Sequence, residues 1–182
     1  MSILPEGIQP LIDANTRLAR SDFPDFNDPS KLGEGKDMVE KLTNLVAIFE
    51  KPELDFSKNR ADNDDILGDA YEYLMRHFAT ESGKSKGQFY TPAEVSRIMS
   101  QVIGLGEAQH ATQSIYDPTC GSGSLLLKAA KILGKENVRQ GFFGQEINLT
   151  TYNLCRINMF LHDINYEKFN IAHGDTLTEP RH

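Results

Sequence analysis

Three carboxylates and a pair of glycines are the residues of this sequence best suited to binding a small molecule. Asp117, Glu146 and Asp175 each follow a short run rich in apolar residues, and Gly121 and Gly123 come just after the first of them. Glycines let a tight turn approach a ligand closely, because no Cβ intervenes and a positive φ carries no steric penalty. A glycine pair also occurs in ordinary turns, so the prediction of a binding site depends on the elements around it.

An alternating pattern of strands and helices positions these residues. The pattern predicts strands at 114–117, 141–146 and 169–172, with helices at 122–133 and 149–162 between them. Alternation with short connections predicts parallel strands and right-handed crossovers, which together form an open α/β sheet. Ligands bind such sheets outside the carboxyl ends of the strands, where all three carboxylates are expected.

The types of these residues favour an adenosine cofactor. Glu146 is placed to accept hydrogen bonds from both ribose hydroxyls, and Asp175 is placed to accept one from the exocyclic amine of a purine. A dinucleotide site requires G-x-G-x-x-G, but Leu126 occupies the third glycine position. Asp117 would repel a phosphate and suits the cationic amino-acid end of S-adenosylmethionine. The sequence therefore favours S-adenosylmethionine over NAD.

The region before this pattern is expected to be helical. Apolar residues recur at three- and four-residue steps in 36–50 and 64–78, which predicts two amphipathic helices. A short helix is expected near 11–20, an ordered loop at 22–33 and a flexible loop at 80–88. Lys84 and Lys86 in the last loop are interpreted as solvated charges or as contacts to DNA phosphates.

A further helix is expected to start at Thr91. Thr91 and Glu94 have the spacing of a capping box, and Pro92 occupies the favoured first position. Val95, Ile98, Met99 and Val102 give this helix an apolar face. Two interpretations stay open: a well-capped structural helix, or a first turn whose N–H groups receive a carboxylate.

Composition and charge restrict the class of protein. The 182 residues have a net charge of −7, all of it in 1–110, because 111–182 carry seven basic and seven acidic side chains. This is not the basic surface of a protein that binds nucleic acid unaided. No signal peptide or membrane span is expected. Two cysteines, Cys120 and Cys155, predict a reducing, cytoplasmic setting, and the histidine spacing predicts no metal site.

Four motifs carry a resemblance to a known family. They are G-Q-F-Y-T-P (87–92), D-P-T-C-G-S-G-S-L-L (117–126), G-Q-E-I-N (144–148) and H-G-D-T-L (173–177). Their order and spacing resemble those of adenine-specific DNA methyltransferases, and most closely those of the modification (M) subunit of type I restriction–modification systems. The resemblance implies a Rossmann-like α/β fold that binds S-adenosylmethionine, here limited to its first three strands and preceded by an α-helical region. It divides the chain into a helical region at 1–86 and the first part of the methyltransferase domain at 87–182.

The resemblance also implies roles for matching residues. The methionine end of the cofactor would lie against Tyr90, Thr91 and Pro92, above a loop formed by Asp117, Gly121 and Gly123. Glu146 would hold the ribose hydroxyls, Ile147 would pack on the adenine ring and Asp175 would bind its amine. Family members methylate the N6 amine of an adenine flipped out of duplex DNA, at a site chosen by a specificity subunit and alongside a restriction subunit.

One motif of the family is absent. The catalytic N-P-P-Y or N-P-P-F motif does not occur before the sequence ends at T-E-P-R-H. The chain is therefore expected to supply the cofactor half of the site, to contain no catalytic residue and to transfer no methyl group alone. Two alternatives remain: a methyltransferase acting on RNA, protein or a small molecule, and a non-enzymatic helical module with a remnant methyltransferase fold.

Overall fold

The chain forms two compact units, residues 1–62 and 63–182. The computed structural model describes residues 3–16, 18–23, 25, 28–54, 66–81, 91–107 and 114–182. Tyr90, Lys84 and Lys86 lie outside the described residues.

The first unit is helical in its described part. It contains α1 (Ile3–Ala14), α2 (Pro29–Leu32) and α3 (Lys36–Phe49), with 3₁₀ turns at Arg20–Asp22 and Pro52–Leu54. Two expectations for this region were wrong: the helix expected near 11–20 ends at Ala14, and the loop expected at 22–33 contains α2. Asp28 begins α2 by accepting a hydrogen bond from the Ser30 N–H at 2.9 Å.

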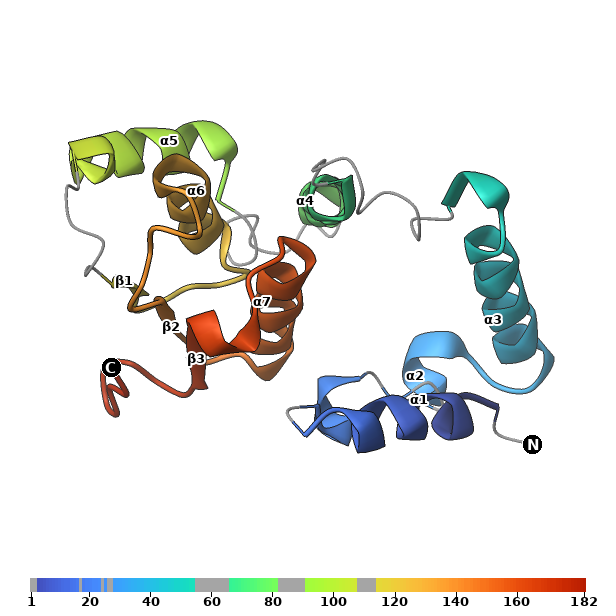
Figure 1. Cartoon of the computed structure of the whole chain (residues 1–182). Helices are drawn as coiled ribbons and strands as arrows, with labels where there is room; N and C mark the ends of the chain where they lie inside the picture. Colours follow the sequence, from blue (N-terminus) through green and yellow to red (C-terminus); the bar gives the residue numbers. More distant parts are fainter. Residues whose placement is uncertain are drawn as a thin grey trace. The chain divides into compact units, whose positions relative to one another are not determined.

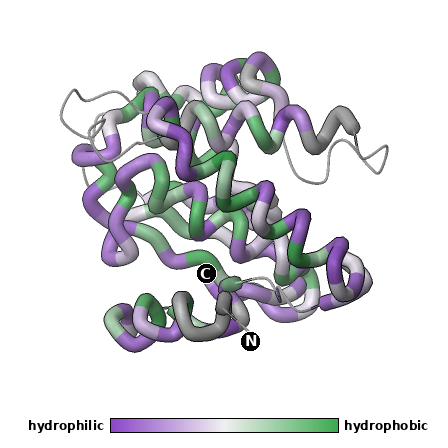
Figure 2. Tube along the Cα trace, turned by 90° about the vertical axis from the view of Figure 1, so that its right-hand side faces the viewer, coloured by the Kyte–Doolittle hydropathy of each residue, from purple (hydrophilic) through white to green (hydrophobic). Residues whose placement is uncertain are grey.

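Helix α3 forms as predicted, but its apolar side chains build no core. None of its residues is buried, and Val39, Val46 and Phe49 are 63%, 52% and 65% exposed. Figure 2 shows hydrophobic and hydrophilic residues mixed along the helices of the chain. The periodicity therefore predicted the helix without predicting what covers its apolar face.

The second unit contains the predicted α/β pattern. Its elements are α4 (Ile66–Glu81), α5 (Ala93–Val102), β1 (Ile115–Asp117), α6 (Ser124–Leu133), β2 (Phe142–Glu146), α7 (Leu149–Leu161) and β3 (Phe169–His173), with 3₁₀ turns at Leu105–Glu107 and Tyr166–Lys168. The strands are parallel in the order β1-β2-β3, and one helix lies between each consecutive pair. The elements from β1 to β3 have ends within two residues of the predicted ones.

The core lies between the sheet and the helices α6 and α7, which cover one side of it (Figure 1). Ile115, Phe142 and Phe169 are in register across the three strands and face this core. Phe142 and Leu126 of α6 are fully buried. Burial of each such side chain contributes about 1.5–3 kcal/mol to the stability of the fold. This packing holds the three strands in register, so that their carboxyl ends lie at the same edge of the sheet.

Helix α5 packs through the face opposite to its apolar one. Ser96 and Ser100 are 1% and 3% exposed, and α5 contacts α6. Their hydroxyls donate to the carbonyls of Pro92 and Ser96, four residues earlier, so their burial leaves no hydroxyl donor unsatisfied. The four side chains of the apolar face are 44–80% exposed: Val95, Ile98, Met99 and Val102. Small side chains let two helices approach closely, and this contact decides the orientation of α5.

Helix α4 belongs to the second unit, although the predicted boundary at residue 86 places it in the helical region. Its Tyr71 hydroxyl donates to the Leu154 carbonyl of α7 at 3.1 Å, and Met75 is buried. Burial raises the pKa of Tyr71, so the hydroxyl stays protonated. The boundary between the two compact units lies after residue 62, before the start of α4. No helix in the described ranges is long and apolar enough to span a membrane.

Candidate cofactor-binding site

The turn after β1 has a shape that only glycine adopts readily. Gly121 and Gly123 have φ values of 55° and 85°, in the left-handed region, and Gly123 caps the start of α6. A Cβ atom on Gly123 would lie 2.9 Å from the Cys155 Sγ of α7. Both the backbone conformation and the close contact with α7 therefore require glycine at position 123. We refer to residues 118–123 as the glycine loop.

The glycine loop is fastened to the neighbouring strand β2. The Cys120 N–H donates to the Gln145 carbonyl at 3.0 Å, and a Cβ on Gly144 would lie 2.9 Å from the Cys120 Sγ. A hydrogen bond with Cys155, together with burial, raises the pKa of the Cys120 thiol. Cys120 is therefore a packed, protonated side chain without the thiolate that a nucleophile needs.

The carboxylate of Asp117, the last residue of β1, lies at the start of this loop. Its Oδ1 accepts a hydrogen bond from the Thr119 N–H at 3.0 Å, while its Oδ2 is buried without a hydrogen-bond partner in the described part of the chain. Burial raises the pKa of Asp117, the Thr119 hydrogen bond lowers it, and the nearby charge of Glu146 raises it further. The ionised side chain thus lacks a cationic or hydrogen-bonding partner at Oδ2.

Glu146 joins two loops at the end of β2. Its Oε2 accepts from the Gly121 N–H at 3.2 Å, and its Oε1 accepts from the Asn148 N–H at 2.7 Å. A carboxylate has about four acceptor positions, so about two remain on Glu146 for a ligand. The structure thereby brings Glu146 to the glycine loop, as the strand order predicts.

Asp175 lies two residues beyond the end of β3, in the turn that follows it. Its Oδ1 accepts from the Leu177 N–H at 2.9 Å, and the intervening Thr176 hydroxyl donates to the Pro118 carbonyl of the glycine loop. The turns after β1 and β3 are thus tied together. Ile147, in the turn after β2, is 65% exposed and open to contact by a ligand.

The predicted capping box at the start of α5 does not form. The helix starts at Ala93 with Pro92 as its N-cap, and no side chain caps it. Proline fits this position because the N–H it lacks would have had no partner inside the helix. Thr91 therefore lies before the helix. The structure describes Thr91 and Pro92 but not Tyr90, so the predicted grouping of these three residues stays a prediction.

Two buried polar residues that were not predicted as site residues hold the loops at this edge of the sheet. Gln145 of β2 is fully buried, and its amide donates to the Glu179 carbonyl at 2.9 Å and accepts from the Arg181 N–H at 3.1 Å. Asn158 of α7 is 2% exposed and donates to the Ser122 carbonyl at 2.9 Å. A glutamine inside an apolar strand and an asparagine inside a buried helix were the available signals, because buried amides require partners.

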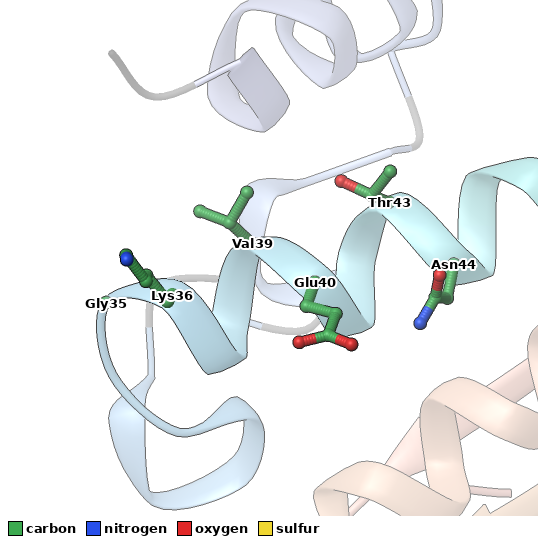
Figure 3. Close-up of a pocket in the computed structure, with 6 residues that line it drawn as sticks. All are labelled: Gly35, Lys36, Val39, Glu40, Thr43 and Asn44. Atoms are coloured by element: carbon green, nitrogen blue, oxygen red, sulfur yellow. The ribbon is translucent and has the colours of Figure 1, made fainter.

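One hollow lies apart from these residues. A surface hollow on α3 is lined by residues of that helix and the glycine before it: Gly35, Lys36, Val39, Glu40, Thr43 and Asn44 (Figure 3). None of the predicted site residues lines it. Across the described ranges, no three His, Cys, Asp or Glu side chains come together as a metal site.

Comparisons with known proteins agree with the motifs. The family model of the N-6 DNA methylases matches residues 62–182. The type I restriction enzyme MpnII methylase subunit of Mycoplasma pneumoniae is 47% identical over 160 residues, which are 86% of this chain and 28% of that protein. The MjaVIII methylase subunit of Methanocaldococcus jannaschii is 35% identical over 81% of this chain and 23% of its own length.

Solved structures agree with the fold. The methyltransferase subunit of the type I restriction–modification system from Streptococcus thermophilus matches 97% of this chain and 36% of its own, with a TM-score of 0.74 and 33% identity. A protein from Listeria monocytogenes described as a class I S-adenosylmethionine-dependent methyltransferase matches 79% of this chain and 46% of its own with a TM-score of 0.55, and its 16% identity supports the fold alone. The predicted fold class and family resemblance are confirmed. The chain spans 23–36% of the length of the three type I subunits.

Proposed function

Because this chain belongs to the N-6 DNA methylase family, we propose that its second unit binds S-adenosyl-L-methionine for methyl transfer to the N6 amine of adenine in DNA. The protein that contains the chain would act as the modification subunit of a type I restriction–modification system. Asp117, Gly121, Gly123, Glu146, Ile147 and Asp175 form the proposed binding site, together with Tyr90, Thr91 and Pro92.

The observation that carries this proposal is the buried Oδ2 of Asp117. This oxygen has no hydrogen-bond partner in the described ranges, and the neighbouring Glu146 adds a second negative charge. A cationic group satisfies both features, whereas a pyrophosphate would meet repulsion. The amino-acid end of S-adenosylmethionine carries an ammonium group next to a sulfonium. The site therefore favours this cofactor over NAD.

The adenosine half of the cofactor would occupy the ends of β2 and β3. Glu146 keeps about two acceptor positions for the ribose hydroxyls after binding the Gly121 and Asn148 N–H groups. The exposed side chain of Ile147 offers a flat apolar contact to the adenine ring. Asp175 uses Oδ1 for its own turn, which leaves Oδ2 to accept from the adenine amine.

The first turn of α5 would receive the methionine carboxylate. The N–H groups of a helix start have no partner inside the helix and favour anions. Because Pro92 is the N-cap, the first free N–H groups belong to Ala93 and the residues after it. The bound cofactor supplies an electrophilic methyl group, and these residues would orient it toward the target amine.

The partner subunits are those of the systems that contain its relatives, and the charge and thiols of this chain agree with them and with action in the cytoplasm. A net charge of −7 leaves this chain without the basic surface that holds DNA, so a specificity subunit would supply most phosphate contacts. A restriction subunit would complete the assembly. Both cysteines are free thiols, which fits action in the reducing cytoplasm.

Calorimetric titration of the intact protein with S-adenosylmethionine and with NAD tests the cofactor. We expect binding of S-adenosylmethionine alone, weakened in Glu146→Ala and unchanged in Glu167→Ala, an exposed carboxylate on the 3₁₀ turn Tyr166–Lys168. Mass spectrometry of DNA incubated with the assembled subunits should then detect N6-methyladenine. Binding of NAD, or of neither ligand by a folded protein, would contradict the proposal.

A further inference from the structure

A buried side chain of helix α7 is hydrogen-bonded to the backbone of the glycine loop. Asn158 of α7 is 2% exposed, and its Nδ2 donates to the Ser122 carbonyl at 2.9 Å across 36 residues of sequence. Ser122 lies between Gly121 and Gly123 and is itself 2% exposed. The hydrogen bond therefore acts on the middle of the loop, between its two left-handed residues.

Two neighbours of Asn158 on α7 press against the same part of the loop. The Cβ position of Gly123 is 2.9 Å from the Cys155 Sγ and 3.9 Å from the Met159 Sδ. Residues 155, 158 and 159 lie on one face of a helix because they are three and four positions apart. This face supports the loop, and Asn158 is its polar member. Asn158 holds a peptide group of the loop through its backbone carbonyl, whereas Cys155 contacts the Cys120 side chain.

Asn158 contributes little net stability to the folded protein, because only one end of its amide has a hydrogen-bond partner among the described residues. Its Oδ1 is buried without a hydrogen-bond partner among the described residues. An unpaired buried acceptor costs at least as much free energy as one intramolecular hydrogen bond returns. An apolar side chain of similar shape would remove the unpaired Oδ1 from the core and would also leave the buried Ser122 carbonyl without its donor, so the two effects on stability oppose each other.

We propose that Asn158 is a positioning residue that sets the shape of the glycine loop and thereby the affinity of the site for its cofactor. Holding the Ser122 carbonyl orients the adjoining peptide groups, including the Gly121 N–H that donates to Glu146. The expected effect on cofactor affinity rests on the proposed function, whereas the expected effect on the shape of the glycine loop does not.

Two substitutions of Asn158 in the intact protein test this role. Asn158→Leu keeps the branched shape and the number of side-chain heavy atoms but removes the donor, so S-adenosylmethionine affinity should fall about tenfold, the effect of one well-placed hydrogen bond, with little change in the midpoint of unfolding. Hydrogen exchange of the amides at 121–123 should accelerate. Asn158→Asp should regain affinity as the pH is lowered, because only the protonated carboxyl can donate to Ser122.

Val138→Ala serves as the matched control. Val138 is 3% exposed in the same hydrophobic core, and its substitution should lower the midpoint without changing affinity or loop exchange. The proposal is overturned if Asn158→Leu leaves both affinity and loop exchange unchanged, or if its effects match those of Val138→Ala. Faster loop exchange in a protein whose wild type binds no S-adenosylmethionine would refute the proposed function and support the positioning role.

Discussion

The carboxylate of Asp117 should have opposite effects on stability and on ligand binding. Asp117→Asn preserves the shape of the side chain and removes its charge. The Thr119 N–H can still donate to the remaining amide oxygen, as it now does to Oδ1 at 3.0 Å. The substitution therefore isolates the charge at Oδ2, which is buried without a partner in the described part of the chain.

The expected change in stability has a defined sign. Burial raises the pKa of Asp117, so the folded protein binds its proton more tightly than the unfolded chain does. The stability that protonation contributes is complete below the ordinary pKa of aspartate and is lost as the pH rises through the raised pKa of the folded state. Asp117→Asn should therefore raise the midpoint of thermal unfolding more at neutral pH than at a pH below the ordinary aspartate value.

Asp117→Asn should weaken S-adenosylmethionine binding, although it stabilises the free protein. One charge-assisted hydrogen bond contributes about 1.5–3 kcal/mol, so its loss should weaken S-adenosylmethionine binding by about 10- to 150-fold. Calorimetry measures the affinity and thermal unfolding at several pH values measures the stability. Asp37→Asn, which removes an exposed carboxylate from α3, is the control and should change neither quantity appreciably.

Two results would refute this reasoning about Asp117. Unchanged cofactor affinity in a folded Asp117→Asn protein would show that the buried carboxylate does not meet the cationic end of the ligand. A lower midpoint at neutral pH, by a difference that disappears at low pH, would show that the charge stabilises the free protein. Either result would remove the observation on which the cofactor assignment depends.

Three further substitutions test the packing around the site. Gly123→Ala should cost about 1–2 kcal/mol for the left-handed backbone plus the clash with Cys155, so urea denaturation should show a loss that Gly123→Ala/Cys155→Ala recovers only in part. Gln145→Met should release segment 179–181, with faster proteolysis there, because both amide hydrogen bonds are lost. Tyr71→Phe should cost about 0.5–1.5 kcal/mol in chemical denaturation, and no loss would mean that the hydrogen bond to Leu154 is negligible.

The α/β part of the fold could be predicted from local patterns. Each strand from β1 to β3 is a short run rich in apolar residues, and α6 has an apolar face, which is the face that it buries. The alternation of strands and helices along the chain identified the rest of this region. The order of parallel strands then brings Asp117 and Glu146 to the same edge, and the hydrogen bond from Gly121 to Glu146 confirms that placement. When the local preferences of the residues agree with the fold of the whole domain in this way, a sequence can be interpreted without homologues.

The helices that cover this part were harder to predict, because periodicity identifies a face without identifying its partner. The apolar face of α5 is exposed, whereas Ser96 and Ser100 of the same helix are buried. Hydroxyls that bond back to their own helix behave as small neutral groups, so they are compatible with a close helix contact. Similarly, α3 has the expected stripe and no buried residue.

The parts of the site that escaped prediction share one physical property. The groups proposed to touch a ligand lie at strand ends, where sequence order reveals them. The groups that hold those loops in shape are buried amides, Gln145 and Asn158, whose partners are backbone atoms 34 to 36 residues away. A carbonyl carries no side-chain signature, so no pattern of residue types could have paired it with either amide. A buried amide within an apolar element is therefore a reason to look for a distant loop that it supports.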